Sequence, residues 1–195
     1  DDRLAADRLA ETERQARLGA LEVGRGEELP QEDRDPALVR ELDLREQLAQ
    51  TQNDLGGIVY LYTGRVDQAK ASLREASELW RQLGNKRMLA DSLASSAAAH
   101  VFSGEYDRAI ALSDEALEIS RSIGNVWGQA YSLWKVGFAY WDRGQVSRAI
   151  DVMETAIRLG EQAGFPAPQS HTRADLAALY GELGMVERGA AVAEA

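Results

Sequence analysis

The chain has 195 residues and a net charge of −10, with 32 acidic and 22 basic side chains, and it contains no cysteine. The missing cysteines exclude disulfides, thiolate metal sites and cysteine nucleophiles, and they fit a reducing, cytoplasmic compartment. The acidic balance, without clustered Lys and Arg, argues against nucleic acid as a partner, and the lack of an apolar run of ~20 residues argues against a membrane.

Residues 1–36 are predicted to form a charged helix followed by an acidic linker. The helix covers about 4–22, and the segment after it is rich in Glu and Asp and contains four helix-breaking residues: Gly24, Gly26, Pro30 and Pro36. A further helix can start near Ala37. The last predicted helix begins near Val186 and is shorter than its counterparts, and the chain lacks an initiator Met, so we expect a piece of a longer protein.

From residue 37 to 195 the sequence repeats with a period of 40 residues. Four glycines mark the period, each followed by a hydrophobic residue two positions later and by Ala or Gly five positions later: Gly64, Gly104, Gly144 and Gly184. Self-similarity at such a period is typical of solenoids, in which a unit buries its apolar face by stacking on its neighbours. The units are predicted at about 45–85, 86–125 and 126–165, with a partial unit at 166–195.

Each unit is predicted to contain two helices, because apolar residues recur at i, i+3, i+4 and i+7 on both sides of the glycine. One such stripe in the third unit precedes Gly144 and consists of Ala130, Leu133, Gly137 and Tyr140. No stretch alternates with a period of two, so strands are not expected and the fold class is all-α. The small residues after each glycine lie where two helices must approach closely, and glycine itself can end the first helix.

The array resembles the tetratricopeptide repeat in the residues at two positions of each unit. Small residues match the eighth position, namely Gly57, Ala97, Gly137 and Ala177, and aromatic residues match the eleventh, namely Tyr60, Tyr140 and Tyr180, with His100 as the exception. The tryptophan usual at the fourth position and the closing proline are absent, and the unit is longer than the common one of about 34 residues. This longer form is similar to repeats appended to bacterial signal-transduction ATPases, cyclases and transcriptional regulators, and to animal polarity scaffolds.

The resemblance implies a right-handed superhelix of antiparallel helix pairs whose first helices line a concave groove. Five aromatic residues of the third unit form one helical stripe with spacings of 4, 3, 4 and 3: Trp127, Tyr131, Trp134, Phe138 and Trp141. The resemblance places most of this stripe in the groove, and Phe102 and His171 of the neighbouring units complete the candidate binding residues. We expect a non-catalytic module that binds an apolar or aromatic-anchored protein or peptide segment, as the sensor or scaffold part of a larger signalling protein.

In two alternative interpretations the protein fills its own groove. The occupant is either a second copy, giving a homodimer, or the chain's own N-terminal segment, giving a regulatory contact. No catalytic residues, metal or cofactor are expected. His100 replaces a tyrosine and is interpreted as a packed side chain, and His171 has no convergent partner in the sequence that would make it a general base. Lys135 alone cannot form the cationic clamp with which related domains hold the acidic tails of chaperones.

Overall fold

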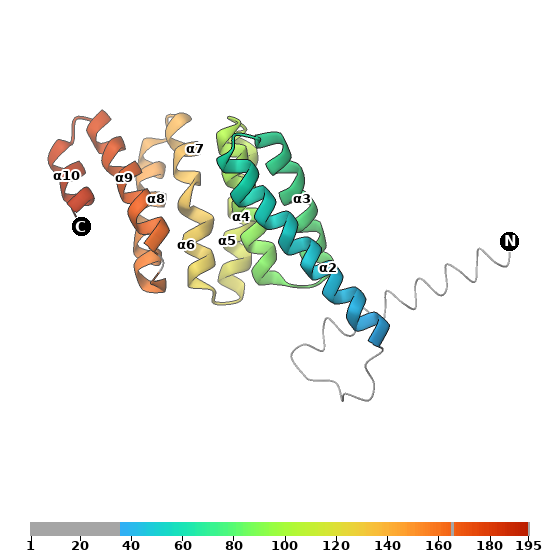
Figure 1. Cartoon of the computed structure of the whole chain (residues 1–195). Helices are drawn as coiled ribbons and strands as arrows, with labels where there is room; N and C mark the ends of the chain where they lie inside the picture. The colour runs from blue at the N-terminus through green and yellow to red at the C-terminus, as the bar shows by residue number, and fades with distance from the viewer. Residues whose placement is uncertain (1–35, 165, 195) are drawn as a thin grey trace.

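A computed structural model describes residues 36–164 and 166–194 as a row of helices. The elements, drawn in Figure 1, are α2 (Pro36–Asp54), the π-helix η3 (Leu55–Tyr60), α3 (Val66–Gln82), α4 (Lys86–Phe102), α5 (Tyr106–Ser122), α6 (Val126–Trp134), α7 (Val136–Asp142), α8 (Val146–Ala163), α9 (Pro166–Glu182) and α10 (Val186–Glu194). These residues contain no strand, which confirms the all-α class. The predicted helix at 4–22 and most of its linker lie outside the described residues.

Glycine ends nearly every helix of the row, as the period predicts. Gly64 and Gly104 have φ angles of 74° and 73°, which lie in the left-handed region where a side chain would be strained. Asparagine begins two of the first helices: the Asn85 side chain accepts a hydrogen bond from the backbone N–H of Met88, and Asn125 accepts one from that of Gly128. These caps satisfy backbone groups that have no partner within the helix.

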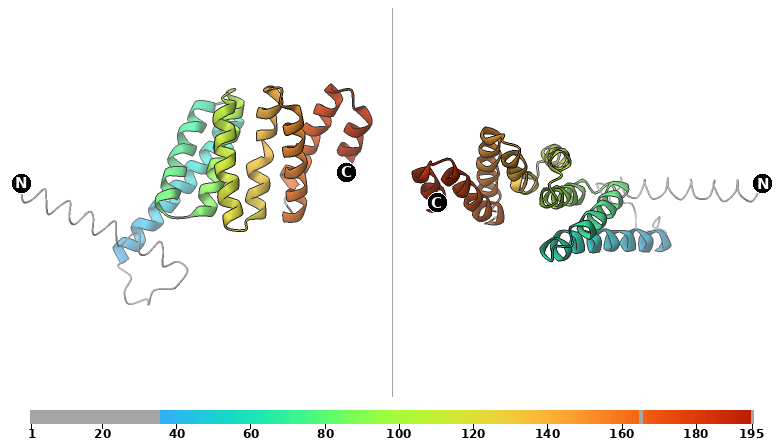
Figure 2. Two further views of the ribbon diagram at one scale, coloured as in Figure 1. Left: turned by 180° about the vertical axis from the view of Figure 1, so that it is seen from behind. Right: turned by 90° about the horizontal axis from the view of Figure 1, so that it is seen from above.

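The helices form antiparallel pairs that stack into a solenoid. The first helices of the units lie on the face seen in Figure 1, and α3, α5 and α8 lie on the opposite face, which Figure 2 shows from behind. The repeated small residues lie between them and have no exposed surface: Ala69, Ala76, Ala109, Ala116, Ala149 and Ala156. Because alanine allows close approach of two helices, the register deduced from the sequence is the register of packing.

Two of the first helices are interrupted, which the sequence pattern did not predict. In the first unit the helix widens into the π-helix η3, and in the third unit it breaks at Lys135 between α6 and α7. Both contain glycine at the eighth position of the unit, Gly57 and Gly137, whereas the uninterrupted α4 and α9 have Ala97 and Ala177 there. Glycine is the weaker helix former by about 1 kcal/mol, so the interruptions occur where the helix is least stable.

Candidate functional site

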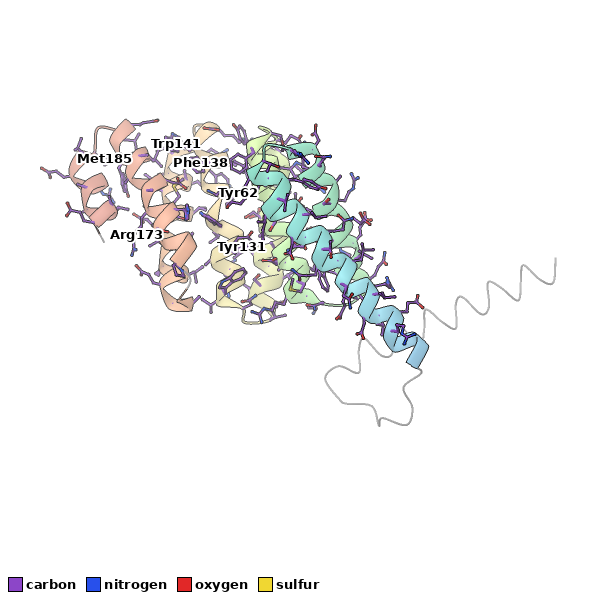
Figure 3. All side chains as sticks on the ribbon, in the orientation of Figure 1. Tyr62, Tyr131, Phe138, Trp141, Arg173 and Met185 are labelled. Carbon is purple, nitrogen blue, oxygen red and sulfur yellow. The ribbon has the colours of Figure 1, made fainter. Side chains whose placement is uncertain are left out.

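The first helices of all four units meet around one hollow. A cavity of about 130 Å³ lies between them, and its walls come from every unit: Gly57, Leu61, Tyr62, Ala94, Ala98, Phe102, Tyr131, Trp134, Lys135 and His171. In the view of Figure 3, Tyr62, Tyr131, Phe138 and Trp141 lie between α2 and α9. The cavity is therefore a property of the array and of no single unit.

Four of the seven candidate residues from the sequence line this cavity, namely Phe102, Tyr131, Trp134 and His171. The other three lie outside its walls. Trp127 borders a second hollow of about 360 Å³, which also includes Arg87 and Asp91. Phe138 and Trp141 stack on each other with ring centroids 5.8 Å apart, and Trp141 packs against the core that contains Tyr140.

The break at Lys135 divides the predicted aromatic stripe into two groups. In the first group the rings of Trp127 and Tyr131 are 5.1 Å apart, those of Tyr131 and Trp134 are 5.8 Å apart, and the Trp134 and His171 rings are 5.4 Å apart. This group continues from the third unit into the fourth. Phe138 and Trp141 form the second group. The expectation of one continuous stripe is wrong at this point, because the helix that was to present it does not continue through Lys135.

Exposure differs between the predicted aromatic stripe and its neighbours. All five residues of the predicted aromatic stripe are half-buried, whereas the neighbouring Tyr62 and Phe102 are 77% and 61% exposed. Sequence analysis missed Tyr62, although it lies one period of 40 residues before Phe102 and could have been found from the register. Exposed aromatic side chains beside an apolar hollow are typical of binding surfaces.

Lys135 lines the cavity, and the charge of Asp175 acts on it. The Lys135 ammonium lies 4.7 Å from the centroid of the Trp134 ring, and burial lowers its pKa. Burial also raises the pKa of the Asp175 carboxyl, while the charges of Lys135 and His171 act in the opposite direction. Asp175 Oδ2 and the Trp134 indole Nε1 are buried without a hydrogen-bond partner among the described residues. This corner of the groove has one group of each sign and no cationic clamp.

A polar network supports the groove beside the second hollow. Asn53 donates to the Asp91 carboxylate at 3.0 Å and accepts from the Ser92 hydroxyl at 2.7 Å. The Tyr131 and Ser95 hydroxyls are 2.9 Å apart, and burial, with the nearby Asp91 charge, raises the pKa of Tyr131 to about 12. Tyr131 is therefore a neutral, fixed wall of the cavity at ordinary pH.

Two properties of the described residues bear on the class of site. No cluster of three or more His, Cys, Asp or Glu side chains in residues 36–164 and 166–194 could hold a metal ion. Among the helices within those ranges, none is both long and apolar enough to cross a bilayer. The features that stand out on the groove face are aromatic side chains, small side chains and the cavity between them.

Comparison with known proteins identifies the repeat. Residues 47–122 match the family model described as the tetratricopeptide repeat. No curated protein matches the chain. Among solved structures, aspartyl phosphate phosphatase F from Bacillus subtilis is similar over 76% of this chain and 39% of its own, with 15% identity and a TM-score of 0.67. This chain therefore spans well under half the length of that protein.

Two further solved structures match this chain over a larger share of their own length. Nearly identical TPR-like repeats from Podosopora anserina match over 76% of this chain and 72% of theirs, with 19% identity and a TM-score of 0.60. BtubC from P. vanneervenii matches over 99% of this chain and 72% of its own, with 22% identity and a TM-score of 0.59. At such identities the likeness establishes the fold alone.

Proposed function

We propose, from the finding that this chain is a tetratricopeptide repeat protein, that it is a non-catalytic module for binding a protein or peptide segment. The segment lies in the groove between the first helices and is anchored there by an apolar or aromatic side chain. The module acts as the sensor or scaffold part of a larger cytoplasmic signalling protein. Tetratricopeptide domains are generally protein-interaction modules, and the groove supplies the particular surface.

The observation that carries this proposal is the cavity shared by the four units. Its volume of about 130 Å³ is close to that of a cavity of about 150 Å³ that accepts a benzene molecule, so it suits one ring or branched aliphatic side chain. Tyr62 and Phe102 border the cavity and remain largely exposed. A side chain that enters would remove their apolar surface from water as well as its own, which favours binding.

The charges around the cavity favour an apolar anchor over an anionic one. Lys135 is a single cation, and its charge is opposed by Asp175 on α9. A ligand carboxylate placed here would pair with the Lys135 ammonium but would also approach the Asp175 carboxylate. An uncharged side chain avoids that repulsion and makes use of the aromatic walls, which include Trp134. The groove is therefore suited to an anchor such as Leu, Phe or Trp.

A library of random peptides displayed on phage, selected on the immobilised full chain, tests the proposal. We expect enriched peptides that share a large apolar residue, and we expect Trp134→Ala or Phe102→Ala to weaken a selected synthetic peptide at least tenfold. Ile123→Ala provides the control, because Ile123 is also exposed but lies in the turn after α5, outside the cavity. The circular dichroism spectrum of each variant must match that of the parent chain.

Two results would contradict the proposal. Selected peptides that bind both groove variants as tightly as the parent use another surface. No enrichment on the full chain, followed by enrichment after residues 1–35 are removed, would show that the chain's own N-terminal segment fills the groove. That second result supports the regulatory alternative and excludes the groove as an open binding site.

A further inference from the structure

The helix at the start of the described array, α2 with η3, leaves one apolar face uncovered. Leu44 is 59% exposed, and Leu48 and Val59 are each 44% exposed. The opposite face of the same helix is packed, since Leu42 and Ala49 are 6% and 0% exposed. In Figure 1, α2 crosses the end of the array with its outer side free of any other described helix.

The position of Val59 is covered in each of the later units. The residues one, two and three periods after Val59 are Ala99, Ala139 and Leu179, and all three are 0% exposed. They are buried because the second helix of the preceding unit packs on them: α3 contacts α4, α5 contacts α6 and α7, and α8 contacts α9. In the later units the Val59 end of this face is therefore packed against another helix.

Polar side chains beside the uncovered face are held away from it. The Arg45 guanidinium donates to the side chain of Gln82, and the Gln52 amide donates to Glu75 at 2.8 Å, so both reach toward α3. The apolar strip beside them, formed by Leu44, Leu48, Leu55 and Val59, therefore stays clear. We call these four residues the α2 strip.

We propose that the α2 strip binds the α2 strip of a second copy of this chain, in an antiparallel helix pair. The four residues are spaced 4, 7 and 4, and this order is the same in both directions. In an antiparallel pair Leu44 faces the partner's Val59, and Leu48 faces the partner's Leu55. The surface is self-complementary, as a twofold interface requires. Leu44 and Leu48 do not line the groove cavity, so this interface differs from the proposed peptide site.

The size of the surface predicts a reversible dimer. The exposed parts of Leu44, Leu48, Val59 and the adjacent Ile58, with the polar edges of the helix, amount to on the order of 600 Å² per copy, and two copies bury on the order of 1,200 Å². That area lies at the lower end of specific interfaces. The charged edge of α2, with Asp43 and Asp54 exposed, limits further growth of the contact.

Sedimentation of the full chain over a range of concentrations tests the proposal. We expect monomers and dimers in exchange, and we expect Leu48→Glu and Val59→Glu each to weaken the association at least tenfold. Leu183→Glu is the matched control, because Leu183 is 43% exposed but lies at the far end of the array, between α9 and α10. It should associate as the parent chain does.

Cysteine cross-linking tests the orientation, because the chain has no cysteine of its own. Leu44→Cys mixed with Val59→Cys should form a covalent dimer that contains one chain of each. Efficient cross-linking of Leu44→Cys with itself would show a parallel pair and overturn the antiparallel arrangement. Val59→Cys alone should remain largely monomeric on a denaturing gel.

Other results would overturn the proposal altogether. A chain that is monomeric at every concentration, and whose unfolding midpoint falls in Leu48→Glu, has this face covered from within the same chain. A chain that is monomeric at every concentration and keeps its unfolding midpoint in Leu48→Glu does not use the strip for binding. Dimers that persist in both glutamate variants use another surface, such as the aromatic groove.

Discussion

The substitution Gly56→Ala tests the close approach on which the first unit depends. A Cβ atom at residue 56 would lie 2.6 Å from Leu73 Cγ and 3.0 Å from the backbone oxygen of Ala69. Leu73 and Ala69 are both fully buried, and the oxygen belongs to the helix α3, so neither atom has room to move. The added methyl must therefore push η3 away from α3.

The expected sign follows from two opposing terms. Alanine is a better helix former than glycine by about 1 kcal/mol. Overpacking a filled site costs about 1–3 kcal/mol. Because one contact is with backbone, we place the cost at the upper part of that range and expect a net loss of about 1–2 kcal/mol.

Gly181→Ala is the matched control, since it makes the same change at a helical position where the added methyl group has no neighbour. A Cβ atom at residue 181 would meet nothing within 4 Å, and the residue lies in α9. Only the helix-propensity term remains, and the free energy of unfolding should rise by about 0.5–1 kcal/mol. Urea unfolding followed by circular dichroism should give midpoints that shift in opposite directions for the two variants.

Equal or rising midpoints in both variants would refute the reasoning, because they would show that η3 does not touch α3 as described. A change in the slope of the unfolding free energy against urea concentration, seen in one variant only, would have another meaning. In a repeat array each unit contacts mainly its neighbours, so a weakened first unit can unfold before the rest. An early transition limited to Gly56→Ala would then locate the damage in the first unit and support the contact.

Three further substitutions test the caps, the packing and the surface charges. Ala109→Leu places a large side chain at a position with 0% exposure and should cost about 1–3 kcal/mol, seen as a lower urea midpoint. Asn85→Ala removes the cap of α4 and should cost about 1 kcal/mol in the same assay. Hydrogen bonds from Lys70 and then His100 lower the pKa of Glu105 to about 2 from an ordinary 4.5, so its contribution to stability is present above pH 4.5 and is lost as the pH falls toward 2. Thermal midpoints of Glu105→Gln should therefore change less than those of the parent over that interval, and an identical pH dependence would contradict the pairing.

The fold was predictable because the residues that determine it recur in every unit. A period of 40 residues, glycine in each turn and alanine at the close contacts specify helix pairs and their stacking, and Ala109 and Ala149 are buried as this pattern requires. Family resemblance at the eighth and eleventh positions added the tetratricopeptide class to the solenoid that the period predicts. The domain limits remain a prediction, since residues 1–35 lie outside the described part.

The site was less predictable, because it depends on departures from the repeat. The sequence located the aromatic residues of the third unit but not the break at Lys135, where a single turn with a bond from Phe138 N–H to the Lys135 carbonyl replaces the regular helix. A stripe deduced from a constant rotation per residue fails wherever the rotation changes. Tyr62 was missed for another reason: its own unit has no aromatic stripe, and only the comparison with Phe102 reveals it.

The break also explains why one aromatic cluster faces the cavity and the other does not. Before Lys135 the rings of Tyr131 and Trp134 lead toward His171 and line the hollow. After it, Phe138 pairs with Trp141, which packs on the core. Under the proposed function, binding and stability therefore divide between two halves of one interrupted helix. A change at Trp134 should act first on partner affinity. A change at Trp141 should act first on the free energy of unfolding, because, of these two tryptophans, Trp141 is the one that packs on that core.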